Sequence, residues 1–203
     1  MHCATSATDA SEWSIGVGGF EDDIGGRSLV AWRAYFPRAT ILACDLVDKP
    51  ELTVGRTTFM QMDQSNTADL AGVAARGPFN LIVDDGSHQN AHQWLTFTAL
   101  FGALAEGGLY IIEDVQTSFW DQDVGGAPWD GAGPNSAAFA ATCVGRMLEM
   151  AKHINYAEFL DPTDADPVLL PFARQIRRIA FEHNLILITK GSNQNPSNRV
   201  QWA

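Results

Sequence analysis

The sequence predicts an α/β domain in which helices cover a mostly parallel β-sheet. Short apolar runs alternate with segments of helical periodicity, which is the pattern of successive β-α units. Near the C-terminus, two strand-like runs at 178–181 and 185–189 are separated by only three residues, which indicates an antiparallel hairpin. A chain of 203 residues is long enough for one domain around one core.

Five strands are expected before this hairpin, and four helices between and after them. The strands are expected at 12–15, 40–44, 57–61, 79–83 and 108–112, and the helices at 28–36, 67–75, 88–105 and 136–153. The first helix has Leu29, Trp32 and Phe36 at helical spacing and stops before Pro37. A pair of glycines separates the third helix from the fifth strand.

Residues 116–135 are expected to form a long loop rich in Gly, Asp and Pro. Loops of this length in compact domains are commonly functional, and this one contains Trp120 and Trp129. We expect an active-site loop that contacts substrate; the alternative is a solvated connection.

The balance of charge excludes several kinds of partner. Thirteen basic and 24 acidic residues give a net charge of −11, which opposes binding to nucleic acid or to an anionic membrane surface. The sequence shows no apolar run of transmembrane length and no signal peptide, so a cytoplasmic protein is expected. The three cysteines form no CxxC pattern and predict neither a disulfide framework nor a zinc site.

Acidic residues follow the fourth and fifth expected strands directly. The fourth strand leads into Asp84-Asp85-Gly86-Ser87-His88, and the fifth leads into Glu113-Asp114. Because the carboxyl ends of adjacent parallel strands open into one crevice, we expect these side chains to lie together. Clustered carboxylates repel one another and favour a bound hard cation with oxygen ligands. The alternative is that both runs are ordinary solvated turns.

The first three strands end in residues suited to a nucleotide-like cofactor. Gly16, Gly18 and Gly19 allow close approach of the backbone. Asp45 is placed to accept hydrogen bonds from ribose hydroxyls, and Asp63 from an adenine amino group. The spacing differs from the dinucleotide fingerprint, so S-adenosylmethionine fits these strand ends better than a nicotinamide cofactor.

Taken together, these motifs resemble those of the metal-dependent sugar O-methyltransferases of antibiotic tailoring, which act on macrolide and rhamnosyl-polyketide sugars. The matching segments are Ile15-Gly16-Val17-Gly18-Gly19-Phe20, Gly26-Arg27-Ser28-Leu29, Asp63-Gln64-Ser65, Asp84-Asp85-Gly86-Ser87-His88, Gly107-Gly108-Leu109-Tyr110-Ile111-Ile112-Glu113-Asp114 and Asn195-Pro196-Ser197-Asn198. The resemblance implies a single catalytic domain over 1–203 with the class I methyltransferase fold. That fold is a Rossmann-like, seven-stranded sheet with its last strand antiparallel and helices on both faces.

The resemblance also implies cofactors, a site and partners. His88 would be the general base, and Asp85, Glu113 and Asp114 would hold Mg²⁺. S-adenosyl-L-methionine would contact Gly16, Val17, Gly18, Gly19, Phe20, Ser28, Asp45, Asp63, Gln64, Asp84 and Asp85. The acceptor would be a hydroxyl of a glycosylated small molecule. Independently of the resemblance, a homodimer or larger oligomer is expected, because a small domain with exposed edges and missing cover often associates.

Two departures from the family pattern support an alternative. Ser14 stands in the first strand where the family usually has an acid, and only about a dozen residues precede that strand. The alternative is a non-catalytic homologue or regulatory subunit that binds S-adenosylmethionine.

Overall fold

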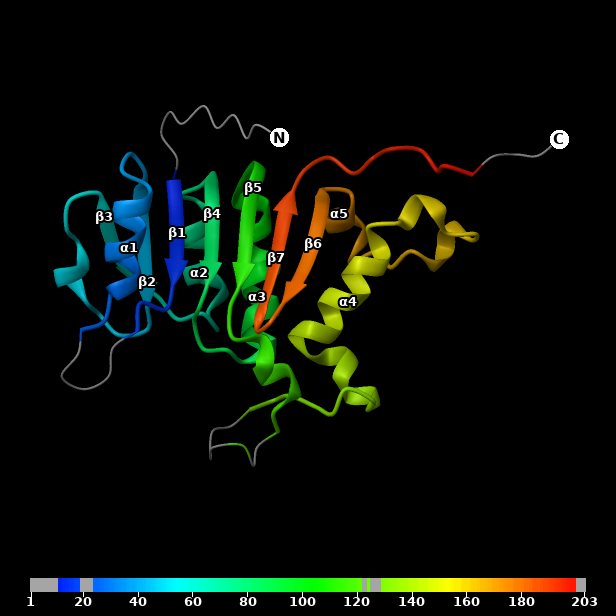
Figure 1. The fold of residues 1–203 in the computed structure, drawn as a ribbon, viewed down its shortest axis with the longest axis horizontal. Helices are drawn as coiled ribbons and strands as arrows, with labels where there is room; N and C mark the ends of the chain where they lie inside the picture. Colours follow the sequence, from blue (N-terminus) through cyan, green and yellow to red (C-terminus); the bar gives the residue numbers. More distant parts are fainter. Residues whose placement is uncertain (1–10, 19–23, 122–123, 125–128, 200–203) are drawn as a thin grey trace.

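The computed structural model describes residues 11–18, 24–121, 124 and 129–199. A mixed sheet has the strand order β3-β2-β1-β4-β5-β7-β6 (Figure 1). The strands are β1 (Ser11–Ile15), β2 (Thr40–Asp45), β3 (Thr57–Gln61), β4 (Phe79–Asp84), β5 (Leu104–Ile112), β6 (Ile176–Glu182) and β7 (Leu185–Lys190). Strands β1 to β5 pair in parallel, whereas β7 runs antiparallel to both β5 and β6. The expected α/β sheet with a C-terminal hairpin is therefore confirmed.

Helices lie on both faces of this sheet. The α-helices are α1 (Arg27–Tyr35), α2 (Thr67–Ala74), α3 (Asn90–Leu100), α4 (Cys143–His153) and α5 (Leu170–Ala173), and short 3-10 turns connect several of them. The alternation of side chains along β2 separates two cores. Ile41 and Ala43 pack with Leu29 of α1, while Leu42 and Cys44 belong to the larger core under α2, α3 and α4.

Two helices are shorter than the sequence pattern predicts. The expected helix 88–105 begins only at Asn90, because His88 has a left-handed backbone (φ 55°) that a helix cannot accommodate, and it ends at Leu100. Strand β5 begins at Leu104, so the glycine pair lies inside this strand and does not separate it from the helix. The expected helix 136–153 consists of a 3-10 turn (Ala137–Ala141) and then α4. Thr142 separates the two as an N-cap that accepts a hydrogen bond from the Gly145 amide.

The described residues of the expected loop at 116–135 pack against the rest of the protein. It begins with a 3-10 turn (Val115–Phe119), and the Gly131 amide donates to the Trp120 carbonyl. Asp130 accepts hydrogen bonds from the amides of Asn90 and Ala91, and so caps the N-terminus of α3. No helix among the described residues is long and apolar enough to cross a membrane.

Candidate metal and cofactor site

The carboxyl ends of β1 and β4 are held in direct contact by a glycine. Gly16 has φ +73°, and a Cβ atom at this position would overlap the carbonyl oxygen of Asp85. The same edge of the sheet receives the residues that follow β2, β3 and β5. The topology thus brings the predicted cofactor loop and the predicted metal ligands to one edge.

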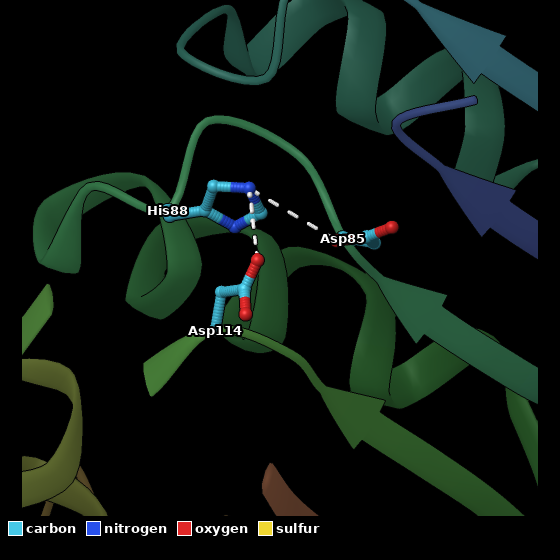
Figure 2. Close-up of side chains that lie close together, drawn as sticks. All are labelled: Asp85, His88 and Asp114. Atoms are coloured by element: carbon cyan, nitrogen blue, oxygen red, sulfur yellow. Dashed lines mark ion pairs between the residues drawn. The ribbon is translucent and has the colours of Figure 1, made fainter. Parts of the chain in front are cut away.

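Asp85, His88 and Asp114 form a cluster at this edge (Figure 2). One potential ligand atom of each lies within 4.8 Å of the others. The His88 Nε2 atom is 3.5 Å from Asp114 Oδ2 and 4.0 Å from Asp85 Oδ1. All three residues are half-buried, so a small ligand can reach them from solvent. The expected meeting of the two acidic runs is therefore present in the structure.

Two members of the cluster have an unusual backbone, and one buried hydroxyl lies against both. His88 and Asp114 have φ values of 55° and 53°, in the left-handed region that non-glycine residues seldom occupy. The Thr117 hydroxyl is 2.6 Å from the His88 carbonyl oxygen and 3.2 Å from that of Asp114. Thr117 is 1% exposed. Its position indicates that it holds the two turns together.

Among the described residues, no lysine or arginine forms an ion pair with the carboxylates of this cluster. Burial, and then the nearby Glu113 and Asp114 carboxylates, raise the pKa of Asp85 to about 7. Burial and Asp114 also raise the pKa of Glu113. The pKa of His88 is lowered by burial, against an opposing effect of Asp114, which favours the neutral imidazole.

The described cluster differs from the expected ligand set in one member. It contains His88 in place of Glu113, whose carboxylate contributes instead as a neighbouring charge on Asp85. The Glu113 backbone carbonyl accepts a hydrogen bond from Gln93 of α3.

Asp84 occupies a different environment from the one expected for a residue that contacts the cofactor. It is 0% exposed, and burial raises its pKa to about 7. Gln64 donates to Asp84 Oδ1 at 2.7 Å and accepts from the Ser87 amide at 2.9 Å. Both Asp84 and Gln64 therefore support the turn that carries Asp85 and His88, and the burial of Asp84 argues against direct cofactor contact.

The acid at the end of β2 is already paired. Lys49 Nζ lies 3.0 Å from Asp45 Oδ2 and donates to the Gly18 carbonyl at 2.6 Å. The amides of Val17 and Val47 also donate to the Asp45 carboxylate. Lys49, which the sequence analysis did not single out, links the glycine turn to β2 and is 8% exposed.

The remaining predicted cofactor residues are more scattered. Asp63 accepts hydrogen bonds from the amide and hydroxyl of Ser65, which lower its pKa. Ser28 lines a hollow of about 520 Å³ on α1 together with Ala31 and Tyr35, and none of the other predicted site residues that the structure describes lines it. Gly19 and Phe20 are outside the described residues.

The chain is similar over most of its length to enzymes that methylate sugars. It is 35% identical over 181 residues to the 8-demethyl-8-alpha-L-rhamnosyl tetracenomycin-C 2'-O-methyltransferase of Streptomyces olivaceus, a match that covers 88% of this chain and 45% of that protein. It is 34% identical to the mycinamicin VI 2''-O-methyltransferase of Micromonospora griseorubida, covering 88% and 43%. No family model matches the chain. Over most of its own length, the chain therefore resembles the sugar O-methyltransferases.

The fold agrees with that of a solved sugar O-methyltransferase. The structure of the MycE methyltransferase in complex with Mg, SAH and mycinamycin VI matches with a TM-score of 0.80 and 32% sequence identity. This match covers 92% of the chain and 46% of MycE. The chain thus spans less than half the length of these sugar O-methyltransferases, and the similarity describes the methyltransferase fold that they share with it.

Proposed function

We propose that the protein is an S-adenosylmethionine-dependent, Mg²⁺-dependent O-methyltransferase that acts on a sugar hydroxyl of a glycosylated natural product or glycolipid. The observation that carries this proposal is the cluster of Asp85, His88 and Asp114 next to the glycine turn. The similarity to sugar O-methyltransferases supports the same reaction class and acceptor class.

The donor set suits a hard divalent cation. Asp85 and Asp114 supply carboxylate oxygens, the ligands that Mg²⁺ prefers, and Glu113 adds charge beside them. Burial, and then the neighbouring Glu113 and Asp114 carboxylates, raise the pKa of Asp85, and a bound cation would favour its charged form. Asp85 and Asp114 would hold the ion, and the proposal retains Glu113 as a ligand candidate.

His88 is suited to take the proton of the acceptor hydroxyl. Its lowered pKa keeps the ring neutral near pH 7, so that one nitrogen can accept a proton. Its Nε2 atom is also the one that faces Asp114, whose carboxylate would stabilise the protonated ring. When bound, the cation would orient the acceptor oxygens and lower the energy of the developing alkoxide.

The cofactor would lie across the ends of β1, β2 and β3. Gly16 holds this turn against the Asp85 backbone, Gly18 with its positive φ lets a ligand approach the backbone closely, and Asp45 and Asp63 supply acceptors at the next two strand ends. Methyl transfer from a sulfonium is governed largely by alignment. Lys49, which fixes the glycine turn to Asp45, would contribute to this positioning.

A screen of acceptors tests the function directly. The full chain is incubated with S-adenosylmethionine, Mg²⁺ and a panel of glycosylated macrolides, polyketides and glycolipids, and products are examined by mass spectrometry for the mass of one methyl group. A methylated sugar whose formation stops with EDTA and resumes with Mg²⁺ supports the proposal. Cofactor binding without turnover on any acceptor would favour the non-catalytic alternative, and turnover unaffected by EDTA would reject the metal requirement.

A further inference from the structure

The outermost strand β6 has an unpaired edge. It pairs with β7 on one side, and among the described residues no backbone hydrogen bond joins Ile176–Glu182 to any other element. Figure 1 shows β6 as the last strand of the sheet. Its residues Arg177, Arg178, Phe181 and Glu182 are exposed, with Phe181 at 40%. An edge of this kind is a template for pairing with a further strand.

The hairpin register fixes which backbone groups face that edge. Glu182 pairs with Leu185 across the two-residue turn, so this closing pair is hydrogen-bonded. Because hydrogen-bonded and non-hydrogen-bonded pairs alternate, Ala180 and Arg178 also bond to β7. The N–H and C=O groups of Ile179 and Phe181 therefore point outward.

We propose that the β6 edge is a homodimer interface, in which β6 of one copy pairs antiparallel with β6 of a second copy about a two-fold axis at Ala180. In this register, Ile179 faces Phe181 of the second copy, and the outward backbone groups of these residues satisfy one another. The same register places Arg178 opposite Glu182 of the second copy, twice by symmetry. One sheet then continues through both copies.

The distribution of charge along β6 favours a second copy of the chain as the partner, and it favours this register. Arg178 and Glu182 are about 13 Å apart along one strand, too far to pair within a copy. Neither makes an ion pair or side-chain hydrogen bond in the part of the chain that the structure describes. Two arginines alone would disfavour edge pairing between copies, because their charges repel. In the proposed register, however, Arg178 of one copy faces Glu182 of the other, and these opposite charges attract. The opposite edge strand β3 has no charged residue and so offers no such self-complementarity.

Charge reversal and its rescue test the interface. Sedimentation velocity across a concentration series measures the dimer dissociation constant of the full chain and of Arg178→Glu, Glu182→Arg and the double variant. Each single reversal places like charges opposite one another and is expected to weaken dimerisation about tenfold or more, whereas the double swap restores it. Arg177→Glu, which changes the same charge outside the proposed pairs, is the matched control.

A backbone variant gives a second readout. Phe181→Pro removes an outward N–H that β7 does not use, so it is expected to abolish dimerisation while the far-UV circular dichroism stays unchanged. Phe181→Ala, which keeps the N–H, is expected to weaken the dimer less. A wild-type chain that stays monomeric at every concentration, an equal effect of Arg177→Glu, or a double swap without recovery would each overturn the proposal.

Discussion

Acidic side chains in the two halves of the same sheet edge have opposite pKa shifts and different partners. At the ends of β2 and β3, Asp45 is paired with Lys49 and Asp63 is hydrogen-bonded to Ser65, which lowers its pKa. At the ends of β4 and β5, burial and mutual repulsion raise the pKa values of Asp85 and Glu113. Among the described residues, the acids of the first half are compensated by a lysine and hydrogen bonds, whereas those of the second half have no lysine or arginine partner; we call these the compensated and the uncompensated half.

The difference indicates where a charged ligand would contribute most. A carboxylate with its own partners gains little from a cation, whereas repelling carboxylates gain both neutralisation and relief of repulsion. The strained turns at His88 and Asp114 lie in the uncompensated half, and strain of this kind is frequent at functional sites. Substitutions in the two halves should therefore have different signs and different dependence on metal.

The largest expected effect is on turnover in the uncompensated half. His88→Asn removes the base, while Asn tolerates the left-handed backbone at this position. For an acceptor that the wild-type chain methylates, kcat should fall by about 10²–10⁴-fold, with the affinity for S-adenosylmethionine measured by calorimetry nearly unchanged. Unchanged kcat would remove His88 from the mechanism.

The same variant separates two roles of His88. If the proposed Mg²⁺ site is present and the imidazole is only a base, Mg²⁺ should raise the melting temperature of both the wild type and His88→Asn. Loss of this increase would identify His88 as a metal ligand, as its place in the described cluster permits.

In the compensated half, the expected effect is on stability. Lys49→Met leaves the Gly18 carbonyl and one Asp45 oxygen without their buried partner, so the free energy of unfolding should fall by about 2 kcal/mol, with or without Mg²⁺. Urea unfolding measures it. Lys152→Met, which breaks an exposed pair with Glu149, is the control and should cost less than about 0.5 kcal/mol. Equal effects of the two variants would contradict the role given to Lys49.

The sequence predicted the fold well because strands and helices leave periodic patterns. The apolar runs of β2, β3 and β4 and the three-residue spacing of the hairpin were enough to place most strands within a residue or two. The start of α3 was not predictable in the same way. It depends on the left-handed backbone of His88 and on capping by Asp130, forty residues away in the chain.

For the site, sequence motifs predicted which residues meet but not what each one contacts. Asp84 and Asp85 are adjacent and identical in type, yet Asp84 is the last residue of β4 and is completely buried, whereas Asp85 follows the strand and is half-buried. Thr117 and Lys49 have no motif, because their roles come from tertiary contacts with backbone carbonyls. A lysine four residues after the β2 acid was the one local signal that was available for Lys49.

A smaller effect is expected at the hydroxyl beneath the cluster. Thr117→Val preserves shape but leaves the His88 and Asp114 carbonyls without this donor, so the free energy of unfolding should fall by about 1–2 kcal/mol. Because those turns carry the cluster, the Mg²⁺ concentration needed for half-maximal thermal stabilisation should rise as well. Thr117→Ser keeps the hydroxyl and should stay close to wild type; if both variants behaved alike, the hydroxyl would have no part in holding the turns.

The smallest effect is expected for two charge-neutralising variants, Asp114→Asn and Asp63→Asn, and it gives the sharpest test of the comparison. The quantity measured is the free energy of unfolding as a function of pH, without metal. The folded-state pKa of Asp85, about 7, lies above its usual 3.8, so the folded chain binds an extra proton between pH 4 and 7. Its free energy of unfolding therefore falls as pH rises through this window. Asp114→Asn relieves the repulsion and should be more stable than wild type at pH 8, by at most about 1 kcal/mol, with the gain fading towards pH 5.

Asp63→Asn should do the reverse. The lowered pKa of Asp63 means that its charge stabilises the folded chain above the unfolded pKa and that this contribution is lost as pH falls. The variant should be less stable than wild type at pH 8, and the difference should close towards pH 3. Chemical unfolding at a series of pH values gives both curves. The sign of each change in the free energy of unfolding depends on whether the protein itself already stabilises the carboxylate. If both variants changed this free energy in the same direction at pH 8, the two halves of the sheet edge would not differ in charge compensation.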